Sequence, residues 1–209
     1  MRDPSVPDDQ QPDSVRQVLL LRHGATQWSA SGRHTGLTDV PLTQPGEQQA
    51  KQLAARLAGR SIALALVSPL QRAQRTATLA GLSDFETDSD LVEWNYGGYE
   101  GLTSAEIRRT HAGWVLWRDG VPPTDAGRAG ESAIDVGHRA DRVIARALAA
   151  LADGDVVLVA HGHLLRVLAA RWLGLAPEAG AYLALDTGSL SALGFEHELR
   201  VIRHWNVLP

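Results

Sequence analysis

Short runs of consecutive apolar residues alternate along the chain with longer segments whose apolar positions recur every three or four residues. Continuous apolar runs of this length predict strands that are buried on both faces, at residues 18–21, 62–67 and 155–160. Helical periodicity and helix-start signals predict helices at residues 43–58, 68–80, 132–152 and 163–173. Further strand patterns predict a short third strand at 85–87 and two final strands within the alternating stretch 189–205.

The order of these elements predicts an α/β fold, in which a mostly parallel sheet is covered by helices on both faces. Residues 88–131 interrupt the alternation of strands and helices. They contain a loop rich in glycine and aromatic residues, a capping-box pattern at Thr103 and Glu106 that predicts a short helix, and a second long loop. We therefore expect one domain over residues 16–209, with a small cap inserted at about 88–131.

Composition narrows the chemistry open to this chain of 209 residues. The absence of cysteine excludes disulfides, Cys-ligated metal centres and a thiolate nucleophile, and Lys51 is the single lysine beside 19 arginines. The net charge of −4 argues against a nucleic-acid partner. Because no apolar run could span a bilayer and no signal sequence is present, we expect no membrane partner and a cytoplasmic location. Prolines and aspartates in residues 1–15 predict a disordered tail.

Basic and imidazole side chains follow three of the predicted strands. Arg22 and His23 come after the first strand, Arg72 after the second, and His161 and His163 after the strand that ends at residue 160. The carboxyl ends of parallel strands meet at one edge of a sheet, where ligands bind. Arginine binds phosphate oxygens with two parallel hydrogen bonds, and an imidazole can attack phosphorus and carry the phosphoryl group. The sequence therefore predicts a site for phosphoryl transfer.

Such a reaction also requires an acid to protonate the leaving oxygen. Glu93 lies between Val92 and Trp94, and apolar surroundings favour the protonated form of a carboxyl group. Glu93 is therefore a candidate general acid, the alternative being an ordinary solvated carboxylate. His163 either lines the site or caps a helix. The spacing of His161 and His163 would suit a metal, but no third ligand has a matching spacing, so we expect no metal.

The combination of these motifs resembles the phosphoglycerate-mutase-like branch of the histidine phosphatase superfamily. The matching stretches occur in the order of the family. They are the Arg-His-Gly tripeptide with Trp28 at residues 21–28, a Gly-x-x-Asp stretch at 36–46, the Ser-x-Leu-x-Arg-Ala stretch at 68–77, the acid-bearing loop at 91–101, a Gly-Glu-Ser stretch at 130–139 and the second His-Gly at 159–162. The resemblance covers roughly residues 18–205 and implies a phosphoglycerate-mutase-like fold.

The resemblance also implies roles for single residues. His23 would be the nucleophile that becomes phosphohistidine, Glu93 the proton donor, and Arg22, Arg72 and His161 the groups that bind the phosphoryl oxygens. The family needs neither a metal nor a cofactor, and its substrates are small phosphate esters. Further substrate-binding positions implied by the match are Ser29, Thr35, Gly36, Tyr96, Gly162 and His163.

Departures from the family pattern favour a phosphatase over a mutase. Ala25 and Ser29 replace the usual Glu and Asn, and Ser104 stands where the mutases carry a lysine. Only 68 positions separate Glu93 from His161, which leaves out the arginine-bearing segment that grips the second acidic group of a mutase substrate. We therefore expect a phosphomonoesterase similar to broad-range or sugar-phosphate phosphatases. The alternatives are a bisphosphoglycerate-dependent mutase and a non-catalytic phospholigand-binding protein.

Other residues near the predicted site are expected to have structural roles. Arg139 is predicted to bind loops, and Arg75 to lie on a helix surface near the site. Within residues 88–131 we expect a solvated basic helix face beside buried tryptophans, formed by Arg108, Arg109, Trp114, Trp117 and Arg118. An edge strand of the predicted sheet would permit a homodimer.

Overall fold

The computed structural model describes residues 16–208, so the tail predicted at residues 1–15 lies outside the described residues. One sheet of six strands has the order β3-β2-β4-β1-β5-β6. Its strands are β1 (Val18–Arg22), β2 (Ile62–Val67), β3 (Glu86–Thr87), β4 (Asp155–Ala160), β5 (Leu190–Glu196) and β6 (Leu199–Val207). The strands β3, β2, β4 and β1 are parallel to one another, and β5 and β6 add two antiparallel strands. The predicted α/β fold with a mostly parallel sheet is confirmed.

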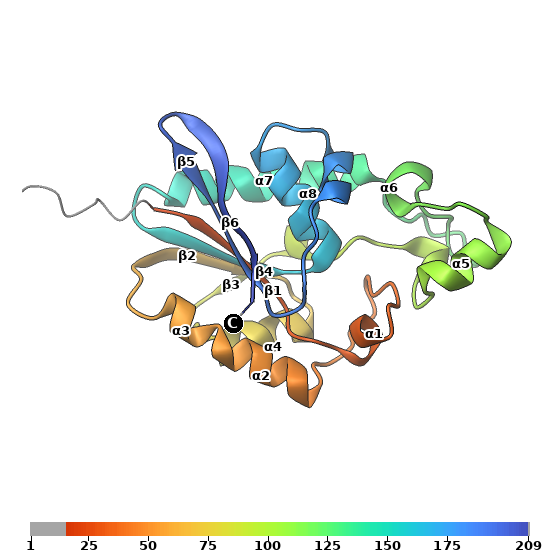
Figure 1. The fold of residues 1–209 in the computed structure, drawn as a ribbon, viewed down its shortest axis with the longest axis horizontal. Helices are drawn as coiled ribbons and strands as arrows, with labels where there is room; N and C mark the ends of the chain where they lie inside the picture. Colours follow the sequence, from red (N-terminus) through yellow and green to blue (C-terminus); the bar gives the residue numbers. More distant parts are fainter. Residues whose placement is uncertain (1–15, 209) are drawn as a thin grey trace, which may run out of the picture.

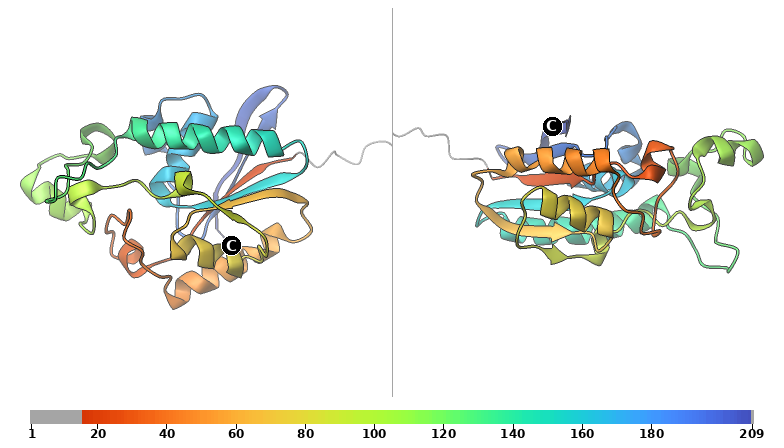
Figure 2. Two further views of the ribbon diagram at one scale, coloured as in Figure 1. Left: turned by 180° about the vertical axis from the view of Figure 1, so that it is seen from behind. Right: turned by 90° about the horizontal axis from the view of Figure 1, so that it is seen from below.

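Helices cover both faces of this sheet (Figures 1 and 2). One layer contains α2 (Gln44–Gln52), α3 (Ala54–Leu57) and α4 (Gln71–Leu79), and the opposite layer contains α7 (Ala133–Ala150) and α8 (Gly162–Trp172). Successive residues of β1 point to opposite faces, so Leu19 and Leu21 join the core beside α2 and α4, whereas Leu20 joins the core beside α7 and α8. The run of apolar residues in β1 is therefore explained by burial on both sides.

Two of the predicted helices differ from the structure. The helix predicted at 43–58 is interrupted at Leu53, whose N–H donates to the carbonyl of Ala50 in a tighter turn. The helix predicted to begin after Ser68 begins instead at Gln71, after an extended Leu70. Ser68 is not its N-cap, because the Ser68 hydroxyl lies 2.7 Å from a nitrogen of His161.

Residues 88–131, called the cap segment below, lie between β3 and α7 and project beyond the carboxyl end of the parallel strands, at the right of Figure 1. The predicted capping box forms at the start of α5, with Thr103 and Glu106 bonded to each other's backbone N–H. Short helical turns that the sequence analysis did not predict are α1 (Gln27–Ala30), η1 (Ser89–Leu91), η2 (Gly97–Tyr99), α6 (Leu116–Asp119) and η3 (Pro177–Tyr182), beside the expected α5 (Ser104–Thr110). Within residues 16–208, no helix is long and apolar enough to cross a membrane.

Candidate active site

A cavity of about 400 Å³ opens at the carboxyl end of the parallel strands, between the sheet and the cap segment. Its lining comes from the loop after β1, the cap segment, the start of α8 and the loop before β5. Of the residues that the sequence proposed for the site, the cavity is lined by Arg22, His23, Ser29, Thr35, Glu93, Tyr96, Gly162 and His163. Arg72, His161 and Gly36 do not line it but lie in the layer directly beneath, as the contacts below show.

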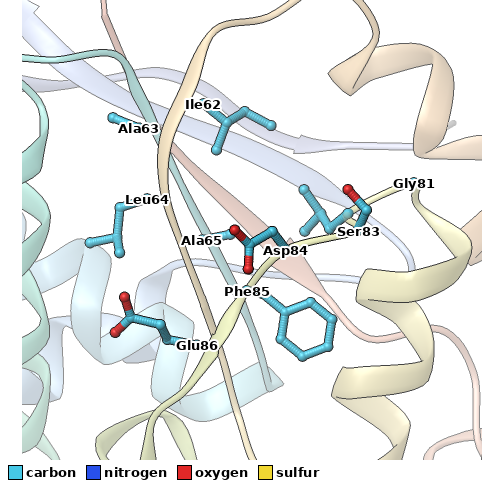
Figure 3. A pocket seen from close by; sticks show the side chains of 10 residues that line it. Ile62, Ala63, Leu64, Ala65, Gly81, Ser83, Asp84, Phe85 and Glu86 are labelled. Carbon is cyan, nitrogen blue, oxygen red and sulfur yellow. The ribbon is translucent and has the colours of Figure 1, made fainter.

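A second cavity, of about 280 Å³, lies along the amino-terminal half of β2 (Figure 3). It is lined by Ile62, Phe85 and the carboxylates of Asp84 and Glu86, and no arginine, lysine or histidine lines it. A phosphate group requires cationic or N–H donors, so this cavity does not suit a phosphate ester.

The sheet brings His23 and His161 together. Arg22 and Ala160 are paired in the register of the adjacent strands β1 and β4, so each histidine is the next residue on its strand. The two imidazole rings meet edge to face, with their centroids 5.1 Å apart. Gly24 is required beside His23, because a Cβ there would lie 2.1 Å from the backbone oxygen of Gly46 in α2.

His23 is held as a neutral imidazole with one nitrogen free. Its Nδ1 lies 2.7 Å from the carbonyl of Gly24, which can only accept, so Nδ1 carries the proton and Nε2 keeps its lone pair. Burial lowers the pKa of His23 well below its usual value of 6.5, and the charges of Arg22 and Arg72 lower the pKa further. No side chain or backbone group among the described residues bonds Nε2, which leaves a nucleophilic nitrogen at the cavity.

Arg22, the residue before His23, has a hydrogen-bond donor without a partner. One terminal nitrogen donates to the carbonyl of Leu185, whereas Nε is the single fully buried side-chain nitrogen or oxygen without a partner in residues 16–208. Gly162 packs against this guanidinium, and a Cβ at that position would lie 3.2 Å from Arg22 Cζ. An unpaired buried N–H costs about 1–3 kcal/mol, and because Nε is covered by protein, a ligand reaches it only after a local movement.

Arg72 is fully buried and is bonded mainly to protein groups. Its terminal nitrogens donate to the carbonyls of Thr35, Gly36 and Thr38 at 2.9–3.2 Å, and Nε donates to His161 Nδ1 at 3.2 Å. Since His161 Nδ1 accepts, its other nitrogen carries the proton and donates to the hydroxyl of Ser68. Burial and the charge of Arg72 lower the pKa of His161 well below 6.5, so His161 is neutral rather than protonated.

Glu100 fixes the loop that holds Arg72. Its carboxylate accepts the N–H groups of Gly36 and Thr38 at 2.9–3.1 Å, and a Cβ on Gly36 would lie 2.5 Å from that carboxylate. Gly36 thus contributes through close packing. The hydroxyls of Ser29 and Thr35 line the cavity but are bonded to the backbone of Thr26 and Arg33. No pattern in the sequence indicates that Ser68 binds His161, or that Glu100 fixes the loop at Gly36 and Thr38.

Glu93 is 5% exposed and lies at the start of α8. Its carboxylate accepts the backbone N–H groups of Trp94, His163 and Leu164 at 2.9–3.0 Å. The apolar setting expected from the sequence is therefore only part of its environment, because three backbone N–H groups, two of them in the first turn of α8, bind the carboxyl oxygens. These bonds also fix the position of the carboxyl group at the wall of the cavity.

The outer wall of the cavity is aromatic and basic. It contains the predicted Tyr96 and His163 and four residues of the cap segment, Arg108, Trp114, Leu116 and Trp117, with His34, Arg33 and Arg166 from other segments. Arg108 is exposed, as expected, but it also lines the cavity, where its Nε donates to the carbonyl of Trp114. The expectation of a solvated basic face holds for Arg109 and Arg118, whose side chains are 75% and 68% exposed. His34 and Arg166 had not been selected from the sequence.

Two more arginines have structural roles. Arg139 binds the carboxylate of Glu131 and the carbonyls of Asp90 and Val92, which ties α7 to the loop that bears Glu93. Arg75 pairs with Glu47 on the surface and does not line the cavity. In the part of the chain that the structure describes, no cluster of three or more His, Asp or Glu could hold a metal ion.

The family model of the histidine phosphatase superfamily (branch 1) matches residues 18–208. The chain belongs to this superfamily. Over 187 residues it is 43% identical to an acid phosphatase of Mycobacterium tuberculosis, a match that covers 88% of this chain and 89% of that protein. It is 34% identical over 196 residues to a probable phosphoglycerate mutase of Salmonella choleraesuis, covering 91% and 90% of the two chains.

Solved structures of histidine phosphatases share the fold of this chain. A mycobacterial glucosyl-3-phosphoglycerate phosphatase in complex with VO3 matches with a TM-score of 0.79 at 32% identity, over 92% of this chain and 99% of that one. The predicted family and the phosphoglycerate-mutase-like fold are confirmed. The family match and these relatives identify the protein as a phosphatase, that is, a hydrolase of phosphate esters.

Proposed function

We propose that this histidine phosphatase hydrolyses small phosphate monoesters without a metal, through a phosphohistidine at His23. The free Nε2 of a neutral His23, at a cavity lined by Arg22 and by the fixed carboxyl group of Glu93, is the observation that carries the proposal. In the first step Nε2 attacks phosphorus, the ester P–O bond breaks, and protonated Glu93 gives its proton to the leaving alkoxide. In the second step Glu93 takes a proton from water, the oxygen attacks phosphorus and the P–N bond breaks.

Three groups would stabilise the charge of the transferred phosphoryl group. Arg22 lines the cavity, and its charge and that of the buried Arg72 both act on the imidazole of His23. The proton on His161 Nε2, held by Ser68 in the free protein, is available if a phosphate oxygen replaces that hydroxyl as acceptor. Neutral donors and fixed cations of this kind stabilise the charge that develops in the transition state. A cytoplasmic location, a homodimer and the lack of nucleic-acid or membrane partners stay predictions.

The proposal favours hydrolysis over mutase activity. A mutase holds an intermediate with two acidic groups and passes the phosphoryl group to a second oxygen of the substrate. Ser104, rather than a lysine, lines the cavity of this chain, and only Arg108 of the three cap arginines considered reaches it. The higher identity to the acid phosphatase than to the probable mutase supports the same reading.

We expect phosphate release from monoesters in the presence of EDTA, with little exchange between 3- and 2-phosphoglycerate. The measurement is a free-phosphate assay over sugar phosphates, phosphoglycerates and nucleotides, beside a coupled mutase assay with and without 2,3-bisphosphoglycerate at equal enzyme. Rapid isomerisation that depends on the bisphosphate, with negligible phosphate release, would assign the chain to the mutases. A requirement for an added divalent metal would contradict the metal-free mechanism.

The low pKa of His23 predicts activity well below neutral pH. The nucleophile is the neutral imidazole, and because its pKa is lowered, it remains neutral down to a lower pH than an ordinary histidine. At pH 5 an imidazole with the usual pKa of 6.5 is about 97% protonated. We therefore expect kcat/KM, corrected for ionisation of the substrate, to show no decrease near pH 6.5 that is due to His23. Initial rates with 4-nitrophenyl phosphate from pH 4.5 to 8 would measure it, and a tenfold loss per unit below 6.5 would contradict it.

A further inference from the structure

One peptide group in the loop after β1 connects the imidazole of His23 to a side chain of α2. The carbonyl of this peptide, from Gly24, lies 2.7 Å from His23 Nδ1, and its N–H, from Ala25, donates to Oε1 of Gln49 at 2.8 Å. Both ends of the peptide are therefore bonded. Gln49 is half-buried and does not line the cavity, so it acts on the imidazole only through this peptide.

The bond at the N–H end of the peptide acts on the carbonyl end in two ways. It fixes the plane of the peptide, and hence the direction of the carbonyl lone pairs. It also polarises the peptide, because hydrogen bonds in a chain strengthen one another. Since the N–H of Ala25 can only donate, the amide of Gln49 must present its oxygen to it. The Gly24 carbonyl is thereby held as the acceptor for the proton on His23 Nδ1.

The side chain of Gln49 is placed by the docking of α2 on this loop. Thr43, the N-cap of α2, donates its N–H and its hydroxyl to the carbonyl of Ala25 at 2.9 and 3.0 Å. Gly46, one turn before Gln49, lies so close that a Cβ there would be 2.1 Å from the same carbonyl oxygen. The helix therefore binds both backbone groups of Ala25, and the absence of a side chain at Gly46 permits its approach.

Further contacts hold the backbone of His23 beside the same side chain. The N–H of Gly188 donates to the His23 carbonyl at 3.0 Å, and a Cβ on Gly188 would lie 2.6 Å from Gln49 Cβ. The N–H of Gly24 donates to the buried hydroxyl of Thr76 at 3.2 Å. The positions of His23 and Gln49 relative to each other are thus fixed by the packing on both sides of the loop.

The position of the proton decides whether His23 can act as a nucleophile. With the proton on Nδ1 the lone pair is on Nε2, whereas a proton on Nε2 would occupy the atom that has to attack phosphorus. Among residues 16–208, the Gly24 carbonyl is the single bonding partner of Nδ1, and no carboxylate takes that place. The choice of tautomer therefore depends on the direction of one backbone carbonyl.

We propose that Gln49 is a positioning residue for the nucleophile: through the Gly24–Ala25 peptide it keeps the proton of His23 on Nδ1 and the lone pair on Nε2. The inference rests on the proposed function for the role of Nε2 in the reaction, but the position of the proton is a property of the free protein. It gives α2, none of whose residues lines the cavity, a part in the phosphoryl transfer.

The test replaces the amide of Gln49 while keeping its stem. Gln49→Met retains the length and the packing of the side chain but puts a methyl group in place of the amide. We expect a mixture of His23 tautomers and a decrease in kcat of about 10- to 100-fold, the scale of loss when a reacting group is misplaced by about 1 Å. KM should change little, because Gln49 does not line the cavity. Gln49→Glu keeps an acceptor oxygen and should retain the wild-type tautomer and most of kcat.

NMR of protein labelled with ¹⁵N-histidine measures the tautomer without any substrate. A ring nitrogen that carries a proton resonates well upfield of one with a lone pair, and the signals of His23 are those that His23→Ala lacks. The wild type should show the proton on Nδ1, and in Gln49→Met the two nitrogen shifts should move toward each other. Gln48→Met makes the same change at the neighbouring, exposed position of α2 and should alter neither the shifts nor kcat.

The outcomes that overturn the inference are a proton on Nε2 in the wild type, or wild-type shifts in Gln49→Met. A loss of kcat without a change of tautomer also overturns it, because Gln49 would then have only a structural role. Gln49→Asn, whose shorter side chain withdraws the acceptor from Ala25, is the second variant should Gln49→Met not fold. Absence of phosphate release by the wild type would instead contradict the proposed function, while the spectra still decide the position of the proton.

Discussion

Replacement of His23 by alanine is expected to lower kcat by more than about 10⁴-fold, which is the scale of loss when a nucleophile is removed. Arg22, Glu93 and the rest of the cavity would stay in place, but among the residues that the structure describes, no other side chain presents a free nucleophile between the ends of β1 and β4. Labelled substrate quenched without acid should leave phosphate on wild-type His23 and none on the variant. His111→Ala, at an exposed histidine, is the matched control and should still trap phosphate.

The chemical nature of the trapped bond decides the mechanism independently of the rates. A phosphoramidate on histidine is labile in acid and stable in base, whereas a phosphoserine is stable in acid. Label on a serine or an aspartate would contradict nucleophilic attack by His23. Thermal unfolding of both variants distinguishes loss of the nucleophile from loss of the fold, since His23 is buried beside the core strand β1.

Glu93→Gln is expected to slow turnover by about 10²–10⁴-fold with alkyl esters, because glutamine cannot supply a proton. The loss should be smaller with 4-nitrophenyl phosphate, whose leaving group needs little protonation. A plot of log kcat/KM against leaving-group pKa should therefore be steeper for the variant. An equal loss with every leaving group would remove Glu93 from the acid role.

The surroundings of Glu93 make a stability control necessary. Both carboxylate oxygens accept backbone N–H groups, and the amide NH₂ of glutamine would face an N–H donor at one of these positions. Some loss of stability is expected from that mismatch, about 1–3 kcal/mol. Assays at a temperature well below the melting point of the variant separate this effect from chemistry. Glu86→Gln, at an exposed glutamate of the second cavity, is the matched control and should keep wild-type turnover.

The strands and long helices were predictable because each is long enough for a periodic pattern. The buried face of α7 that the sequence indicated, through Val136, Ala140, Val143 and Ala147, is the face that the structure buries. Short turns such as α1 and α6 span only four residues, too few for a period to show. Local sequence favours Ser68 as a helix cap, but the helix begins at Gln71, and the side chain of His161, 93 positions away, binds the Ser68 hydroxyl.

The inner part of the site was predictable for a topological reason. Parallel strands end at one edge, so residues that follow β1, β2 and β4 meet there whatever the loops do. His34 and Glu100 do not directly follow a parallel strand, and their place at the site depends on how the loops pack. Arg166 follows β4 in α8, but its guanidinium is positioned by the backbone of η3. A single sequence contains no pattern for such contacts. The contact between His163 and Tyr96, 67 positions away, is of the same kind.

The inner part of the site, at the strand ends, and its outer wall, in the cap segment, belong to different parts of the fold. This affects how such a protein can diverge in evolution. His23 and His161 extend from the two central, fully buried strands, whereas Tyr96, Trp114 and Trp117 belong to a segment that contributes no strand to the sheet. Substitutions in that segment alter the wall that faces the alcohol while the strand ends keep their register. New substrate ranges are thus accessible through substitutions in this segment that leave Glu93 in place, while the strand ends keep His23 and His161 together.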